Sequence, residues 1–109
     1  MNKTGNAAEH RAMMYIKKVY RWDIIDLKKY NMMFDNLYKI DIVAKSKDGL
    51  MGIQVKSIGS YKNHFLQGVS NIEQKKLYDD MKKINDKVKF KSFYLFIVSS
   101  NKIRVIKLG

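Results

Sequence analysis

The segment FYLFIV, residues 93–98, constrains the fold of this chain more than any other feature. An unbroken apolar run of this length is typical of a strand that is covered on both faces of its sheet. The preceding segment, 69–86, carries apolar residues from Ile72 to Ile84 roughly on one side of a helix. Such a helix is long enough to join two parallel strands. The chain is therefore predicted to contain a strand–helix–strand crossover.

The remaining segments complete one α/β domain. A length of 109 residues is typical of a single domain. Segment 5–20 has apolar residues at helical spacing, and the other segments have the β-branched, alternating pattern of strands. These strands are expected at 22–30, 37–46, 49–57 and 102–108. The order α-β-β-β-α-β-β predicts a mixed central β-sheet flanked by helices across residues 1–109.

The charge of the chain is strongly positive. Lysine and arginine number 22 against 10 acidic residues, so the net charge is +12. A small domain this basic attracts polyanions, of which nucleic acid is the first expectation. An alternative source of the charge is the lysine-rich, proline-free composition that AT-rich coding favours, in a virus or an AT-rich microbe. The size and imbalance of the charge favour nucleic-acid contact.

Several classes of protein are excluded by what the chain lacks. There is no cysteine, which rules out disulfides and thiolate metal sites. Two histidines, His10 and His64, are too few for a zinc cage. No apolar run is long enough to span a bilayer, and no secretory signal is recognisable. We therefore expect a cytoplasmic protein without a membrane partner.

A central hairpin is predicted by Asp48 and Gly49, because this dipeptide suits the positive φ angles of a type I′ turn. With this turn, Asp41 lies directly across from Lys56. Alternation then sorts the two strands into two faces. The apolar face carries Ile40, Ile42, Ala44, Met51, Ile53 and Val55, and the opposite face carries Asp41, Val43, Gln54 and Lys56. The second face thus gathers a carboxylate, an amide and an amine from one hairpin.

Two interpretations of this polar face are open. In one, Asp41 and Lys56 are an ordinary cross-strand ion pair on a solvated surface, with Gln54 beside them. In the other, the oxygen atoms of Asp41 and Gln54 share a metal ion, because side chains roughly 5–8 Å apart at Cβ can reach one ion. Local grounds favour the ion pair, since such pairs are far more common than active sites.

The wider pattern resembles the PD-(D/E)xK nuclease superfamily. The motif of that superfamily is an aspartate, a turn and then (Asp/Glu)-x-Lys on the next strand, and IDIVAKSKDGLMGIQVK, residues 40–56, has this order. The preceding helix carries Glu9 in GNAAEHRAMMYI, which is similar to the first helix of archaeal-type Holliday junction resolvases. Gln74 and Tyr78 have the Gln-x-x-x-Tyr spacing of an exonuclease branch of the superfamily. The resemblance covers residues 5–80 and implies a restriction-endonuclease-like αβββαβ core.

Two positions depart from the pattern of this superfamily. Ile40 replaces the proline that precedes the aspartate, which leaves the chemistry unaffected. Gln54 replaces the acidic residue, so an uncharged amide oxygen stands where a carboxylate binds the metal. This departure implies weaker metal affinity or a larger share for Glu9 and Asp41. Its extreme outcome is a protein that binds DNA without cutting it.

The resemblance implies a role for each of these residues. The metal ligands are expected to be Glu9, Asp41, Gln54 and the backbone carbonyl of Val55, and the catalytic set to be Glu9, Asp41, Gln54 and Lys56. The metal is expected to be Mg²⁺, for which Mn²⁺ can substitute. Lys56 would orient or deprotonate the attacking water, or stabilise the developing charge. Local grounds explain Glu9 equally well as an acid near a helix N-terminus.

Further residues are expected to contact nucleic acid. These are Arg11, Ser57, Lys62, Gln74 and Lys75, with Lys76 as an additional phosphate contact; a solvated lysine has the same sequence pattern. The implied function is a Mg²⁺-dependent endodeoxyribonuclease that acts on branched or duplex DNA as a homodimer, since a four-way junction needs paired symmetric cuts. The alternative is a basic nucleic-acid-binding protein with a degenerate nuclease fold and no catalysis.

Overall fold

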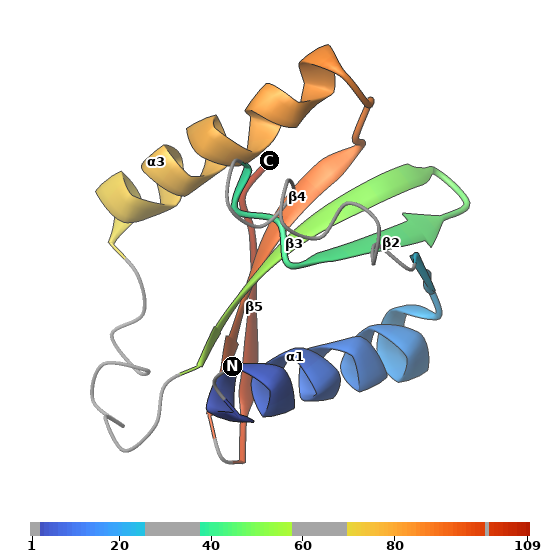
Figure 1. Ribbon diagram of the computed structural model, residues 1–109, viewed down its shortest axis with the longest axis vertical. Helices are drawn as coiled ribbons and strands as arrows, with labels where there is room; N and C mark the ends of the chain where they lie inside the picture. Colours follow the sequence, from blue (N-terminus) through green and yellow to red (C-terminus); the bar gives the residue numbers. More distant parts are fainter. Residues whose placement is uncertain (1–2, 26–37, 58–69, 100) are drawn as a thin grey trace.

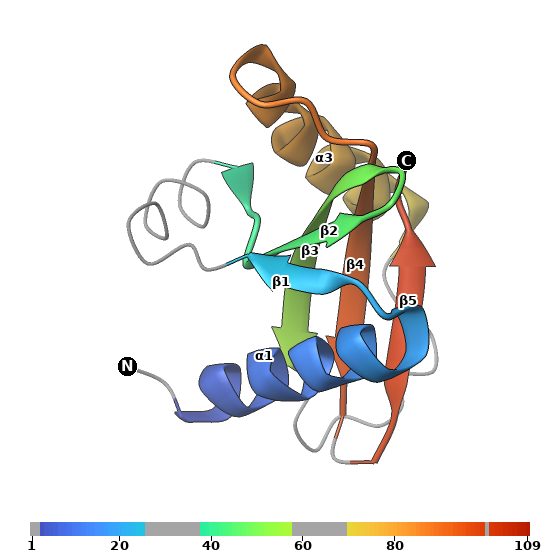
Figure 2. The same ribbon diagram turned by 90° about the vertical axis from the view of Figure 1, so that its right-hand side faces the viewer.

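A mixed sheet lies between two helices in the computed structural model of the chain (Figure 1). The structure describes residues 3–25, 38–57, 70–99 and 101–109, and within these ranges the sheet has five strands. In spatial order they are β1 (Asp23–Ile25), β2 (Ile42–Ser46), β3 (Gly49–Ser57), β4 (Ser92–Val98) and β5 (Ile103–Lys107). Helices α1 (Lys3–Tyr15) and α3 (Asn71–Lys82) cover opposite faces (Figure 2). The predicted element order and the mixed α/β sheet are confirmed.

The α1 face of the sheet is closed by small and branched side chains at helical spacing. Ala8, Ala12 and Ile16 are buried in one cluster with residues of β2, β3 and β4. The helix continues into a short π-helical turn, η1 (Ile16–Tyr20). A hydrogen bond from the Arg21 N–H to the Ile16 carbonyl, 2.9 Å long, closes this end. The helix predicted at 5–20 is therefore present, and its apolar stripe lies against the sheet except at Val19, which is 55% exposed.

Helix α3 is the crossover between β3 and β4, which run parallel as predicted. Ser70 caps its N-terminus by accepting a hydrogen bond from the Glu73 N–H at 3.2 Å. A 3₁₀ turn, η3 (Lys83–Asp86), follows its last residue. Met81 is fully buried, whereas Ile72 is 83% exposed. The predicted apolar stripe of this helix is therefore wrong for Ile72, its first residue.

Strand β4 is buried on both faces, as its apolar run predicts. Phe96 packs in the cluster beneath α1. Phe93 packs on the other side of the sheet with Met81, and Leu95 packs there with Leu77 of α3. This strand therefore joins the two layers of the core and holds β3 in place between α1 and α3.

The turn of the central hairpin differs from the prediction. The turn residues are Lys47 and Asp48, because Ser46 pairs with Gly49 across the ladder. The Ser46 hydroxyl accepts a hydrogen bond from the Asp48 N–H at 3.0 Å and donates one to the Gly49 carbonyl at 3.1 Å. Gly49 takes a φ of 140° as the first residue of β3, a conformation that favours glycine. The predicted Asp48–Gly49 turn is therefore wrong, although the hairpin itself is present.

The ladder is consequently shifted by two residues. Lys45, and not Lys47, pairs with Leu50. The predicted position of Asp41 directly across from Lys56 is therefore wrong. Because side chains alternate with a period of two, an even shift leaves the side chains of the paired strands on their predicted faces. Gln54 and Lys56 remain together on the side of the sheet away from α1.

Strand β2 begins later than the strand predicted at 37–46. The chain bends at Asp41, between Ile40 and the start of β2, and this bend interrupts the alternation that the prediction assumed. Ile40 consequently packs with Met81 on the α3 side, and Ile42 packs on the α1 side. The predicted apolar face is wrong for Ile40 and is confirmed for its other members.

Some expectations fall partly outside the described residues. The strand predicted at 22–30 is present as β1 at Asp23–Ile25, and its remainder lies in a range that the structure does not describe. Within the four described ranges, no helix combines the length and the apolar character needed to cross a membrane.

Candidate functional site

A pocket of about 330 Å³ lies between the C-terminal half of β3 and helix α3. Strand β3 contributes Gln54 and Lys56, and Lys39 adds a third side from the segment before β2. The complete lining is Lys39, Gln54, Lys56, Glu73, Lys76, Leu77 and Asp80. Three lysines against two carboxylates leave this pocket net positive, which suits a phosphate group.

Gln54 brings an unusual polar atom to this pocket. Its Nε2 lies 3.5 Å from the Val55 carbonyl oxygen, at the long limit for a hydrogen bond. Its Oε1 is buried and has no hydrogen-bond partner among the described residues. A buried oxygen without a partner costs about 1–3 kcal/mol. Gln54 lines the pocket, but this oxygen is shielded from solvent, so a ligand in the pocket would reach it only if the amide turned.

Asp41 stands where the β2–β3 ladder ends. Its N–H donates to the Ile53 carbonyl at 2.8 Å, and its Oδ2 accepts a hydrogen bond from the Val55 N–H, also at 2.8 Å. The carboxylate therefore occupies the place of the next backbone carbonyl in the ladder. It lies against the backbone of the residue between Gln54 and Lys56, but Asp41 is not among the residues that line the pocket.

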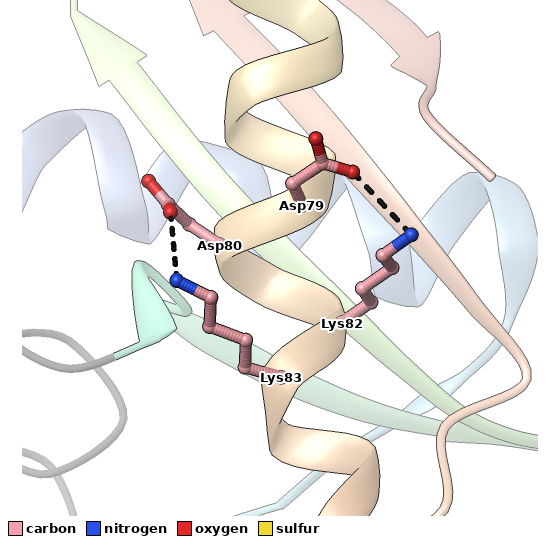
Figure 3. Close-up of polar contacts among 4 residues, drawn as sticks. All are labelled: Asp79, Asp80, Lys82 and Lys83. Carbon is pink, nitrogen blue, oxygen red and sulfur yellow. Dashed lines mark ion pairs between the residues drawn. The ribbon is translucent and has the colours of Figure 1, made fainter.

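The cross-strand ion pair between Asp41 and Lys56 is absent. Among the residues that the structure describes, salt bridges join Lys82 to Asp79 at 3.4 Å and Lys83 to Asp80 at 3.6 Å (Figure 3). Both pairs span one turn at the C-terminal end of α3. The two-residue shift of the ladder explains the absence, because it moves Lys56 beyond the position opposite Asp41.

Several other predicted residues lie outside the pocket. Glu9 is half-buried on α1, which covers the opposite face of the sheet from α3. The guanidinium of Arg11 donates to the Ser99 carbonyl and so ties α1 to the residue after β4, a structural role that the sequence did not predict. Ser57 is the exposed last residue of β3. Lys62 lies outside the described residues.

The predicted residues of α3 are only partly gathered at the pocket. Gln74 is half-buried and Lys75 is exposed, and neither lines the pocket, whereas Lys76 does. Tyr78 packs edge-on against Phe93, with ring centroids 6.0 Å apart. The tyrosine of the Gln-x-x-x-Tyr spacing is thus a core contact of α3 in this fold.

Three polar lining residues were not predicted from the sequence: Lys39, Glu73 and Asp80. Glu73, Lys76 and Asp80 recur at the spacing of one helix face. A crossover helix packs on the strand that it leaves, so this spacing is a usable signal for residues that face the end of β3. Lys39 carries no such signal, because its position depends on a left-handed backbone conformation.

Two oxygen donors of the kind that Mg²⁺ binds lie near Val55 in this region. Mg²⁺ prefers oxygen ligands and retains several waters, and the Asp41 carboxylate and the unpartnered Oε1 of Gln54 both lie beside Val55. Across the described ranges, no group of three His, Cys, Asp or Glu side chains is placed to hold a metal ion. A metal here would therefore depend on the Gln54 amide and on water as well as on carboxylates.

No protein-family model matches the chain, and no curated protein matches it either. The pocket, its charges and its donor atoms are therefore the grounds on which a function can be argued.

Proposed function

We propose that the protein is a Mg²⁺-dependent endodeoxyribonuclease of the PD-(D/E)xK type. The observation that carries this proposal is the hydrogen bond from the Val55 N–H to the Asp41 carboxylate, 2.8 Å long. It holds the carboxylate beside Val55 of β3, and the two chain neighbours of Val55, Gln54 and Lys56, both line one pocket. The buried Gln54 Oε1 without a protein partner supports a ligand at this position. The net charge of +12 supports a polyanionic substrate.

Each residue of the candidate site has a role in this proposal. Asp41 and Gln54 would hold Mg²⁺ through oxygen, with the Val55 carbonyl as a further ligand, directly or through water. Glu9 is not part of this set, because it lies on α1, across the sheet from the pocket. The bound ion, or Mn²⁺ in its place, would supply the Lewis acidity that polarises a phosphodiester and lowers the pKa of a bound water. The Lys56 side chain would orient the attacking water, or as the neutral amine accept its proton, or as the ammonium stabilise charge on the phosphoryl oxygens.

The proposed substrate is branched or duplex DNA. Lys39 and Lys76, on the walls of the pocket, would bind the phosphates that flank the cut. Ser57 follows Lys56 in the chain, and Lys75 precedes Lys76. Both are exposed and would extend this contact with the DNA. Cutting a four-way junction requires two symmetric sites, so this form of the proposal includes a homodimer with twofold symmetry. The proposed location is the cytoplasm.

A second function is favoured by the donor set of the site. No group of three carboxylate or histidine ligands occurs in the described ranges, and an amide stands in the acidic position of the motif. These features suit a basic DNA-binding protein that has a nuclease-like fold and does not cut. In that protein the lysines of the pocket bind phosphate and Gln54 ligates no metal.

A cleavage panel separates these two functions. The protein is incubated with a four-way junction, a flap, a single strand and a duplex, each with Mg²⁺, Mn²⁺ or EDTA. The nuclease proposal expects metal-dependent cutting that both Lys56→Gln and Lys56→Arg abolish, because a planar guanidinium does not replace a compact ammonium. Lys45→Gln, at an exposed lysine of β2, is the matched control and is expected to cut normally.

The outcomes of this panel are distinct. DNA binding without cutting on every substrate and with either metal assigns the second function. Equal cutting by the unmodified protein and by Lys56→Gln would assign the activity to a contaminant. Sedimentation of the protein with and without junction DNA tests the homodimer separately.

A further inference from the structure

A second basic pocket lies where α1 and η1 lead into β1. It has a volume of about 680 Å³ and is lined by Lys17, Lys18, Arg21, Trp22, Asp23 and Ile24. Three cations stand here against one carboxylate. This end of α1 lies on the side of the molecule away from the first turn of α3, so the second pocket is separate from the candidate site (Figure 1). The proposed cleavage chemistry does not use it.

The three cations of this pocket are available to an anion. Lys17, Lys18 and Arg21 are exposed, and none of them forms a salt bridge with another residue that the structure describes. Lysines in the last turn of a helix also interact favourably with the helix dipole, which gives Lys17 and Lys18 a structural reason to be there. Arg21 is the C-cap residue directly after η1, so the dipole also favours its charge, and its backbone conformation is the separate observation.

The backbone of Arg21 supports a binding role. Arg21 has a φ of 59° and a ψ of 36°, a conformation that glycine or asparagine adopts at lower cost. Lys39 also has a φ of 59°, and it lines the first pocket. Among the described residues, these two are the non-glycine positions with positive φ. Strained backbone positions gather at ligand-binding sites, and both of these positions carry cations that line pockets.

Trp22 gives the second pocket an aromatic wall. Its ring stacks on Tyr20 with centroids 4.7 Å apart and an interplanar angle of 18°, and it lies 5.6 Å from the ring of Tyr94. Trp22 is only half-buried, and it lines the pocket. Cations beside an accessible aromatic ring are the combination that holds single-stranded nucleic acid, through its phosphates and through base stacking.

We infer that this pocket is a second DNA-binding site, which holds the phosphodiester backbone of a single-stranded segment. Lys17, Lys18 and Arg21 bind successive phosphates, and a base packs on Trp22. The inference rests on the proposed function in one respect, namely that the segment belongs to the DNA on which the candidate site acts. A substrate that reaches both pockets must carry a single strand next to its cutting point, as a flap does.

Trp22 is the single tryptophan of the chain, so its fluorescence reports directly on this pocket. The probe is an oligodeoxythymidine of about 16 nucleotides, the upper end of common single-strand site sizes. The pocket variant is Lys17→Gln/Lys18→Gln/Arg21→Asn, in which asparagine tolerates the left-handed conformation. The matched control is Lys87→Gln/Lys89→Gln/Lys91→Gln, which removes the same charge from exposed lysines outside both pockets.

The expected result has three parts. The oligonucleotide changes the emission of Trp22 in the unmodified protein. The pocket variant loses affinity on the order of 100-fold at 0.1 M salt, and its slope of log K against log salt falls by about 2, since three phosphate contacts are lost. The control loses much less affinity. Equal losses in both variants, an emission that does not respond, or a loss on duplex but not on single strand would overturn the inference.

Cleavage and stability measurements keep the two proposals apart. If the unmodified protein never cuts DNA but the pocket variant alone loses binding, the nuclease proposal fails and the second site stands. If cutting is confirmed but the pocket variant binds single strands as well as the control does, the second site fails alone. A lower melting temperature with unchanged affinity would assign these lysines to the helix end and would also overturn the inference.

Discussion

Substitution of Asp41 tests the fold and the chemistry of the candidate site in one series. The Asp41 Oδ2 accepts the Val55 N–H at 2.8 Å, and a hydrogen bond to a charged partner contributes about 1.5–3 kcal/mol to stability. Asp41→Ala should therefore lower the free energy of unfolding by about 2 kcal/mol, or about 8 °C in melting temperature for a domain of this size. Asp41→Asn keeps a neutral acceptor and should lose only about 1 kcal/mol.

The assay pairs urea denaturation with DNA cleavage on the same preparations. We expect the unmodified protein to be the most stable, Asp41→Asn to be less stable and Asp41→Ala to be the least stable. Both substitutions should abolish metal-dependent cutting, because each removes the negative charge that holds the cation. Asp86→Ala, at an exposed aspartate of η3, is the control and should change stability by less than about 0.5 kcal/mol. Cutting by Asp41→Asn at the unmodified rate would refute the role of the carboxylate, and an Asp41→Ala protein of unchanged stability would refute the hydrogen-bond argument.

Three further predictions concern other parts of the molecule. Gln54→Glu adds a carboxylate at the unpartnered oxygen and should lower the Mg²⁺ concentration for half-maximal cutting by about tenfold, as charge is added to the ligand set; an unchanged magnesium titration would show that this side chain is not a ligand. Gly52→Ala would place a Cβ 2.8 Å from Cδ1 of Phe93 and 3.3 Å from Cδ2 of Phe90. This substitution should lower the free energy of unfolding, measured by urea denaturation, by about 1–3 kcal/mol. An unchanged urea midpoint would mean that the two phenylalanine rings can move to make room for the methyl group. Burial, and then the neighbouring Tyr15 and Tyr94, raise the pKa of Tyr20, so the unfolded chain loses this proton first as pH rises. The contribution of Tyr20 to stability is then complete below about pH 10 and is lost as pH rises further, so the stability advantage over Tyr20→Phe should fall above about pH 10 and stay constant at lower pH; a constant difference throughout would contradict the shift.

Elements that depend on one local pattern were predictable from the sequence. The run at 93–98 identifies β4 as a strand buried on both faces, and the helical segment before it identifies the crossover. The register of the hairpin was not predictable from Asp48 and Gly49 alone. The Ser46 hydroxyl bonds to the backbone of Asp48 and Gly49 and so stabilises a turn one residue earlier than the predicted one. Such local side-chain hydrogen bonds compete with the preference of the Asp-Gly dipeptide for the turn positions.

The candidate site was predictable to the same extent. Gln54 and Lys56 share a face because alternation is local, and the error in register was even and preserved that face. The contact of Asp41 was not predictable, because its carboxylate bonds to a backbone N–H of β3 and not to a side chain across the ladder. The contribution of Lys39 depends on backbone conformation, which the sequence pattern does not specify for a residue other than glycine.

The identity of residue 54 bears on how such a site would use its metal. A glutamate with its carboxylate buried here would be penalised whenever no cation was bound, because an uncompensated buried charge is far more costly than a buried amide. The amide of Gln54 leaves one oxygen without a partner, a smaller cost, and keeps that oxygen as a donor. Glutamine therefore suits a site that folds without its metal and binds the ion weakly, together with substrate. On this argument chelation should stop cutting without lowering the melting temperature, whereas a site whose metal was part of the fold would lose both together.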